Sequence, residues 1–182
     1  MCRLIKKDKQ ALSFWSGGTT REIYIYPENT SYQKRDFRFR ISFATVDTYE
    51  SVFTKLDDVI RLIMPLSEKL ELLIETSMGT EKTELSNGEV LKFDGGADVK
   101  SIGKGTDFNL MMKNCDGSIS KVSGLVEFPL EGFKALYFLE SGCYHIRDET
   151  FYSDQGDLLI VENEVGIRIT NSAIMINVKG FE

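Results

Sequence analysis

The sequence predicts an all-β protein, and three observations lead to this fold class. Apolar and polar residues alternate along many short segments, turn-forming residues separate these segments at intervals of about 8–12 residues, and helical spacing is scarce. This rhythm is typical of a β-sandwich or barrel. The 182 residues, of which 42% are hydrophobic, are enough for one domain or two small fused ones.

The segment 37–44 shows the alternation most clearly. Its apolar residues fall on one face of a strand and its polar residues on the other, and the polar ones are Arg38, Arg40 and Ser42. The other strands that we expect are 21–26, 58–65, 69–75, 90–93, 135–139, 143–147, 157–161, 166–170 and 173–179. A turn at 170–172 separates the last two of these, and 48–57 could hold a short helical turn.

Composition excludes several classes of function. The formal net charge is −6 and the pI is about 5.0, so the chain repels phosphate backbones and we expect no nucleic-acid partner. We find neither a signal peptide nor an apolar run that would span a membrane, which favours a cytoplasmic protein without a membrane partner. The three cysteines are widely spaced and odd in number, which argues against a disulfide framework.

Metal and nucleophilic chemistry have little support. The chain has one histidine, His145, between Tyr144 and Ile146, and a single imidazole in such a setting is more typical of a strand residue than of a metal ligand. We therefore expect no metal and no cofactor. No Gly-x-Ser-x-Gly pattern is present for serine catalysis. Glu22 would be a candidate acid or base if it were buried.

Five sequence blocks carry a family resemblance. They are Trp15–Ile23, Phe39–Ala44, Asp58–Arg61, Phe93–Gly95 and Gly105–Met111. In this order they resemble the HutD/Ves family over roughly residues 12–112. The chain departs from the family pattern at Phe39, where the family usually has Trp, at Ser16, where it often has Asn, and after Phe93, where an acid and a glycine are transposed.

The resemblance implies a double cupin, that is, two packed β-barrels or sandwiches of the RmlC-like jelly-roll type. With a break near 128–132, residues 1–127 would form the first barrel and carry the motifs, and residues 128–182 would form a second half that shares strands with it. The family is associated with histidine utilisation and stress responses. It implies a metal-free binding protein for a small carboxylate, of the formylglutamate or urocanate kind, in a sensing or regulatory role.

Two other classes of function remain open. One is an isomerase or C–N hydrolase that acts on the same class of ligand, with Glu22 as the base. The other is a structural or interaction barrel that binds no ligand. A homodimer is possible in every case, because edge strands often pair between subunits.

The resemblance and the side-chain chemistry together assign one set of residues to a ligand site. The set is Trp15, Thr19, Glu22, Arg40, Ser42, Arg61, Asp107 and Asn109. The two arginines would anchor a carboxylate, the polar residues would orient it, and Trp15 would wall the pocket.

Each assignment has a structural alternative. Arg40, if it faces a barrel interior, must be paired, either with Glu22 or Asp107 or with a ligand acid. Arg61 has the same choice between an ion pair and a ligand. Asp107 and Asn109 could instead cap a turn, and Trp15 could be a residue of the core.

Overall fold

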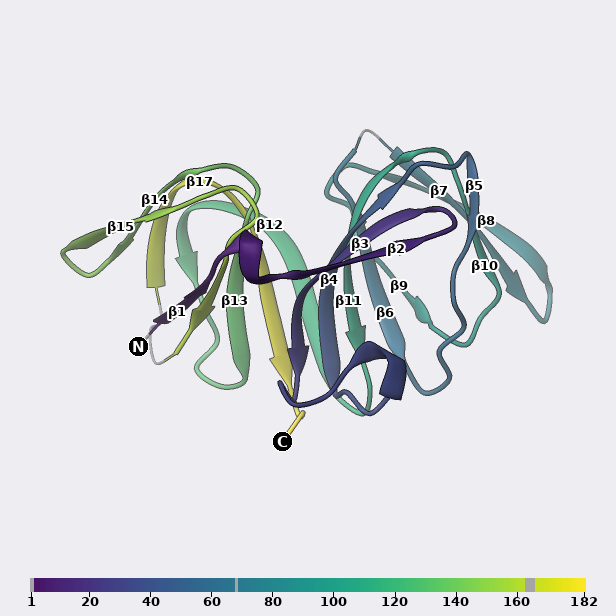
Figure 1. Ribbon diagram of the computed structural model, residues 1–182, viewed down its shortest axis with the longest axis horizontal. Coiled ribbons are helices and arrows are strands. Elements are labelled where there is room, and N and C mark those ends of the chain that lie inside the picture. Colours follow the sequence, from purple (N-terminus) through teal and green to yellow (C-terminus); the bar gives the residue numbers. More distant parts are fainter. Residues whose placement is uncertain (1, 68, 163–165) are drawn as a thin grey trace. The chain divides into compact units, whose positions relative to one another are not determined.

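The computed structural model describes residues 2–67, 69–162 and 166–182 (Figure 1). It is an all-β structure in which strands form curled sheets, as the alternation predicts, and the only helical elements among the described residues are two short 3-10 turns. Within the described chain, no helix has the length and apolar character needed to cross a membrane.

The chain divides into two compact units. Residues 11–114 form the first, which contains all five sequence blocks and is called the motif unit here. Residues up to 10 and from 115 onward form the second, which contains both ends of the chain and is called the terminal unit. These bounds differ from the expected 1–127 and 128–182, because the segment 116–127 pairs along its length with the last strand of the chain.

The motif unit contains two antiparallel sheets. The six-stranded sheet has the order β2 (Ala11–Trp15), β3 (Gly18–Tyr26), β4 (Phe39–Val46), β11 (Gly105–Met112), β6 (Ile60–Pro65) and β9 (Leu91–Asp94). The four-stranded sheet has the order β5 (Glu50–Val52), β10 (Val99–Ile102), β7 (Lys69–Thr76) and β8 (Gly79–Ser86). The 3-10 turn η2 (Tyr32–Lys34) lies between β3 and β4.

Strand β4 carries the alternation that the sequence predicts. Phe39 and Ile41 are fully buried on one face, while Arg40 and Ser42 lie on the other. Strand β11 repeats the pattern, with Phe108 and Leu110 buried on the apolar face. Both faces of these central strands are therefore withdrawn from water, which is unusual for a strand that carries a guanidinium group.

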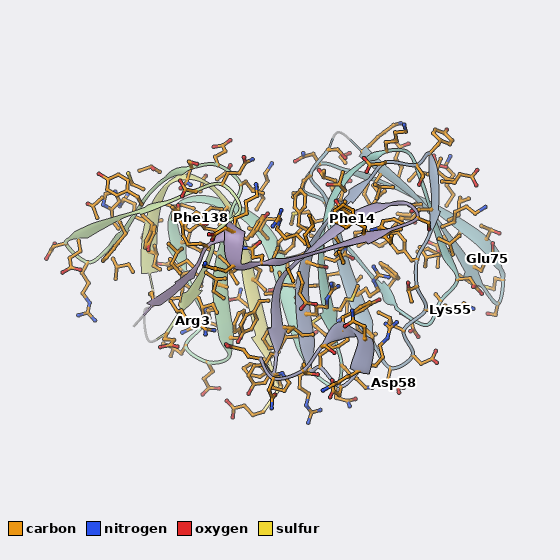
Figure 2. The ribbon with its side chains drawn as sticks, viewed as in Figure 1. Arg3, Phe14, Lys55, Asp58, Glu75 and Phe138 are labelled. Carbon is orange, nitrogen blue, oxygen red and sulfur yellow. The ribbon has the colours of Figure 1, made fainter. Side chains whose placement is uncertain are left out.

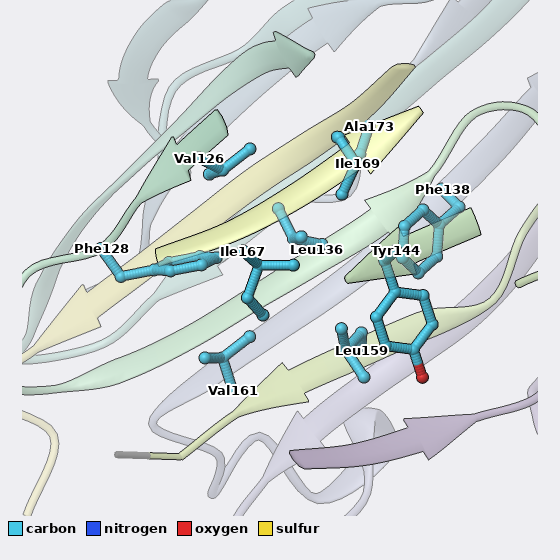
Figure 3. Packing of buried hydrophobic residues seen from close by; sticks show 10 residues of the cluster. All are labelled: Val126, Phe128, Leu136, Phe138, Tyr144, Leu159, Val161, Ile167, Ile169 and Ala173. Carbon is cyan, nitrogen blue, oxygen red and sulfur yellow. The ribbon is translucent and has the colours of Figure 1, made fainter. Parts of the chain in front are cut away.

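The terminal unit is a seven-stranded antiparallel sheet. Its order is β1 (Cys2–Ile5), β16 (Leu158–Val161), β13 (Phe133–Phe138), β17 (Gly166–Lys179), β14 (Gly142–Ile146) and β15 (Glu149–Ser153), and β12 (Asp116–Glu127) also pairs with β17. The 3-10 turn η1 (Lys7–Lys9) follows β1. Alternate residues of these strands meet in an apolar core (Figure 3), in which the rings of Phe138 and Tyr144 stack 5.6 Å apart.

Two expectations about strands are wrong. Segments 166–170 and 173–179 are one continuous strand, β17, because the extra residues at 170–172 are absorbed by an irregularity in its pairing with β12, near Val122 and Gly124. Segment 48–57 contains the short strand β5 instead of a helical turn, because Ser51 and its neighbours pair with β10.

Asp157 fastens the first residues of the chain to the terminal unit. Its fully buried carboxylate accepts hydrogen bonds from the Lys6 ammonium (2.7 Å) and from the backbone N–H groups of Lys7 (3.0 Å) and Asp154 (3.0 Å). Burial by itself would raise the pKa of Asp157, but these hydrogen bonds outweigh it and lower the pKa below its usual range.

Asp157→Asn should destabilise the protein by about 2–3 kcal/mol, because an amide offers one acceptor where three donors converge. The wild-type contribution is present above the ordinary pKa of an aspartate and is lost as the pH falls through the lowered value. Urea denaturation at neutral and acid pH measures both effects. Asp154→Asn is the control: Asp154 shares Lys6 but is exposed, so it should change stability by less than about 0.5 kcal/mol. Equal losses from the two variants would contradict this account.

Candidate functional site

The motif unit contains a cavity of about 330 Å³ on the polar face of its six-stranded sheet. Strand period determines which residues line it. Arg40, Ser42, Ala44 and Val46 follow one another at every second position of β4, and Asp107, Asn109 and Met111 do so on β11. Arg61 of β6 completes this floor. Adjacent strands thus bring side chains far apart in sequence onto one surface.

Arg61 is the least satisfied polar residue of the floor. It is 6% exposed, and its Nη2 donates a hydrogen bond to Oδ1 of Asn109 at 3.0 Å. Its Nε has no hydrogen-bond partner among the described residues. The guanidinium packs against the rings of Phe53 (4.7 Å) and Phe93 (5.4 Å). Burial lowers the pKa of Arg61 to about 10, so the side chain stays charged at neutral pH.

Asp107 lies beyond Asn109 on the same strand. The carboxylate is 3% exposed and accepts a short hydrogen bond from Nδ2 of Asn109. Burial raises the pKa of Asp107 to about 7, although the charge of Arg61 and the hydrogen bond from Asn109 both oppose this. Both residues lie inside β11 and are buried, so the interpretation of a capped turn is wrong.

Arg40 is held by three neighbours. Its Nε donates to Oε2 of Glu22 at 2.6 Å, its Nη1 reaches Oγ of Ser42 at 3.4 Å, and its guanidinium carbon lies 4.3 Å from the centre of the Tyr32 ring. Arg35 lies at the same distance from that ring. Of the two protein acids that the sequence left open as partners of Arg40, Glu22 is the one that pairs with it.

The β2–β3 hairpin contributes apolar residues that are open to solvent. Phe14 and Trp15 both line the cavity, yet Phe14 is 79% exposed and Trp15 is 37% exposed. Figure 2 labels Phe14, which belongs to strand β2 of this hairpin. Trp15 is therefore not a core residue. Val52 of β5 is a third exposed apolar residue of the lining. The cavity thus combines a buried charged floor with an exposed apolar rim.

The structure brings together most of the residues that the sequence assigns to the site. Six of them line the cavity: Trp15, Arg40, Ser42, Arg61, Asp107 and Asn109. Thr19 does not, because Thr20 occupies the inward position of β3. Glu22 is absent from the lining and reaches the site through its ion pair with Arg40.

Sequence reasoning missed Thr20, Tyr32, Arg35 and Phe53, all of which line the cavity. Thr20 could have been predicted from strand alternation, since it lies two residues before Glu22 on the same strand and therefore on the same face. The other three lie outside the strands, where no periodicity indicates a direction.

His145 pairs with the Thr150 hydroxyl at 3.0 Å on the β14–β15 hairpin of the terminal unit. Within residues 2–67, 69–162 and 166–182, no three His, Cys, Asp or Glu side chains gather in a group that could hold a metal ion.

Two neighbouring glycines shape the hairpin in different ways. A Cβ at Gly17 would lie 1.9 Å from the Trp15 ring, which packs directly on this glycine. A Cβ at Gly18 would lie 1.9 Å from the carbonyl oxygen of Thr45, and Gly18 has a φ of +152°. A side chain can rotate away from a clash, whereas the backbone of a paired strand cannot.

Gly18→Ala should therefore cost about 2–3 kcal/mol of stability, because it combines backbone strain with a backbone clash. Gly17→Ala should cost less than about 1 kcal/mol but displace the indole. Trp15 is the only tryptophan, so its fluorescence reports this movement without interference. Thermal denaturation and emission spectra of both variants check the pair. Equal stability losses with unchanged emission from Gly17→Ala would contradict the described packing.

The chain is similar in structure to two Pseudomonas proteins. HutD from Pseudomonas fluorescens SBW25 superposes with a TM-score of 0.78 at 18% identity, and a conserved protein of unknown function from Pseudomonas aeruginosa PAO1 does so with 0.80 at 18% identity. In both cases 98% of each chain is covered. Oxalate decarboxylase from Lactobacillus farciminis gives 0.67 at 8% identity, over 96% of this chain and 85% of that one.

These similarities show an all-β, cupin-like fold. No curated protein matches the chain in sequence. A model of the family described as HutD matches residues 7–175. Because this match spans nearly the whole chain, the protein belongs to the HutD family.

Proposed function

We propose that the protein is a small-molecule-binding double cupin whose motif unit holds a carboxylate in the cavity above Arg61. The unpartnered Nε of Arg61 carries this proposal. A buried N–H group without a partner costs free energy, and Nε forms, with the adjacent Nη, one of the edges through which a guanidinium binds both oxygens of a carboxylate. An entering carboxylate would satisfy the donor that the protein leaves unsatisfied.

The charged residues that line the cavity favour an anionic ligand. Arg35, Arg40 and Arg61 line the cavity, and Asp107 is the acidic residue of the described lining. Glu22 neutralises Arg40 from outside it. The lining is therefore locally cationic in a protein whose net charge is −6, and such a concentration of positive charge attracts an anion to this place on an acidic surface.

The size and rim of the cavity narrow the class of ligand. A volume of about 330 Å³ is near the lower end of small-molecule sites, which suits a metabolite rather than a large cofactor. Phe14, Trp15 and Tyr32 offer apolar or flat surfaces around the charged floor. A formylated amino acid or urocanate combines a carboxylate with a compact body that fits this arrangement. The biological role would be metabolite sensing or regulation in histidine utilisation or in a stress response, in the cytoplasm.

The position of Glu22, the base that the enzyme alternative requires, argues against that alternative. Glu22 is held by Arg40 at 2.6 Å and does not line the cavity, so it is poorly placed to take a proton from a ligand. Binding without chemistry is the function that the geometry supports best.

A thermal-shift screen tests binding, with formate, formylated amino acids, urocanate and glutamate as probes. The structure of HutD from Pseudomonas fluorescens is described for a formate condition, and formate is the smallest carboxylate, so it belongs in the panel. A ligand at 100 times its dissociation constant should add about 2.7 kcal/mol of apparent stability. Arg61→Gln should weaken this ligand at least about tenfold, because a buried charged hydrogen bond to the carboxylate is lost.

Arg38→Gln is the matched control. Arg38 is an exposed arginine next to β4 that does not line the cavity, so its variant should keep the wild-type shift. The binding proposal fails if a folded wild-type protein responds to none of these acids, or if Arg61→Gln and Arg38→Gln weaken the response equally.

A further inference from the structure

Asp107 and Arg61 are coupled through one amide. Arg61 Nη2 donates to Oδ1 of Asn109, and Nδ2 of Asn109 donates to Oδ1 of Asp107, so the orientation of the amide is fixed from both sides. Among the described residues the guanidinium and the carboxyl group form no direct ion pair. Asp107 is nevertheless close enough for its charge to act on Arg61.

The charged and titratable groups around Asp107 come from every neighbouring element. Arg61 of β6 acts on its charge, and Arg40 of β4, Tyr32 of η2 and Arg35, which follows η2, line the same cavity. Arg40 is neutralised by Glu22 of β3, and Arg35 lies over the Tyr32 ring on an exposed segment. Asp107 is thus the internal anion that balances Arg61.

A carboxylate bound at Arg61 Nε would place a second anion beside the same guanidinium. Two carboxylates in one buried site cannot both remain ionised at low cost, so one of them takes up a proton. The ligand carboxylate would be bound directly to Arg61, whereas Asp107 contacts that residue only through Asn109. Asp107 is therefore the group that gains the proton.

We propose that Asp107 makes binding in this cavity proton-linked: an anion is held at Arg61 while the Asp107 carboxyl is protonated, and it is released when that carboxyl ionises. This inference rests on the proposed binding function and adds its regulation. It would let the protein respond to pH as well as to ligand concentration.

The direction of the pH dependence follows from the environment of Asp107. Burial raises the pKa of this carboxyl to about 7, and a second negative charge beside it would raise the pKa further. Binding therefore takes up protons near neutral pH. The affinity should be constant where Asp107 is already protonated and should fall as the pH rises above about 7, by up to about tenfold per pH unit for one linked proton.

Isothermal titration calorimetry with N-formyl-L-glutamate measures this linkage. The carboxyl groups of this probe titrate below about pH 5, so they contribute no change between about pH 5.5 and 8.5. Wild-type protein should bind more weakly at the alkaline end. Titrations near pH 7.5 in two buffers of different ionisation enthalpy should show net uptake of up to one proton.

Asp107→Asn provides the second arm, because an amide resembles a protonated carboxyl and still accepts from Asn109. This variant should bind at pH 8.5 as strongly as wild type does at pH 5.5, with no proton uptake. Asp98→Asn is the control: Asp98 pairs with Lys55 on the surface and lies outside the cavity, so its variant should keep the wild-type pH profile.

The possible outcomes separate this inference from the function on which it rests. Binding by wild type with a flat pH profile and no proton uptake overturns the role of Asp107 and leaves the binding function intact. If the affinity of Asp107→Asn falls with rising pH as steeply as that of wild type, another group carries the proton linkage, and the role of Asp107 is overturned. No binding by wild type at any pH overturns both proposals. If Asp107→Asn does not fold, the number of protons that wild type takes up on binding still tests the role of Asp107.

Discussion

The motif unit depends on the burial of two guanidinium groups on one face of its central sheet. Removing a charged group from water costs several kcal/mol unless partners replace the lost hydration. The structure supplies Glu22, Ser42 and Tyr32 to Arg40. To Arg61 it supplies Asn109 and two aromatic rings, while the buried Nε finds no hydrogen-bond partner in the described part of the chain. The two arginines look alike in sequence, but their surroundings differ: Arg40 is paired with an acid, whereas Arg61 contacts an amide and aromatic rings.

This difference explains how much of the site was predictable. Alternation within β4 indicated that Arg40 and Ser42 lie on one polar face. Strand β11 was not predicted, and Asp107 and Asn109 were assigned to the site by the family block and their side-chain chemistry. The partner of Arg40 could not be chosen from sequence, because Glu22 and Asp107 were equally suitable acids. The strand order places both acids next to β4, and the register distinguishes them. Glu22 lies opposite Ser42, two residues from Arg40, whereas Asp107 lies opposite Ala44, four residues from it.

The fold shows the same limit of sequence patterns. Strands with a clear apolar pattern were recognisable: β4 by its alternation and β13 by its continuous apolar run. Strand β8 was missed, since most of its residues are exposed and Glu81, Lys82 and Glu84 place charge on both faces. Strand β12 was missed because Gly and Ser interrupt its pattern. The pairing partners of these strands, β7 and β17, hold them in place through backbone hydrogen bonds, which leave no trace in side-chain composition.

The junction at Asp157 has a consequence for the order of folding during synthesis. Lys7 and Asp157 are 150 residues apart in sequence, and β1 has β16 as its strand partner. Every sheet of the motif unit, by contrast, is built from residues 11–114 alone. On the ribosome, the motif unit can therefore fold while β1 is still unpaired, because β16 has not yet been synthesised. An unpaired strand edge is prone to wrong pairing. The time that the last quarter of the chain takes to leave the ribosome therefore sets how long β1 is exposed to this risk.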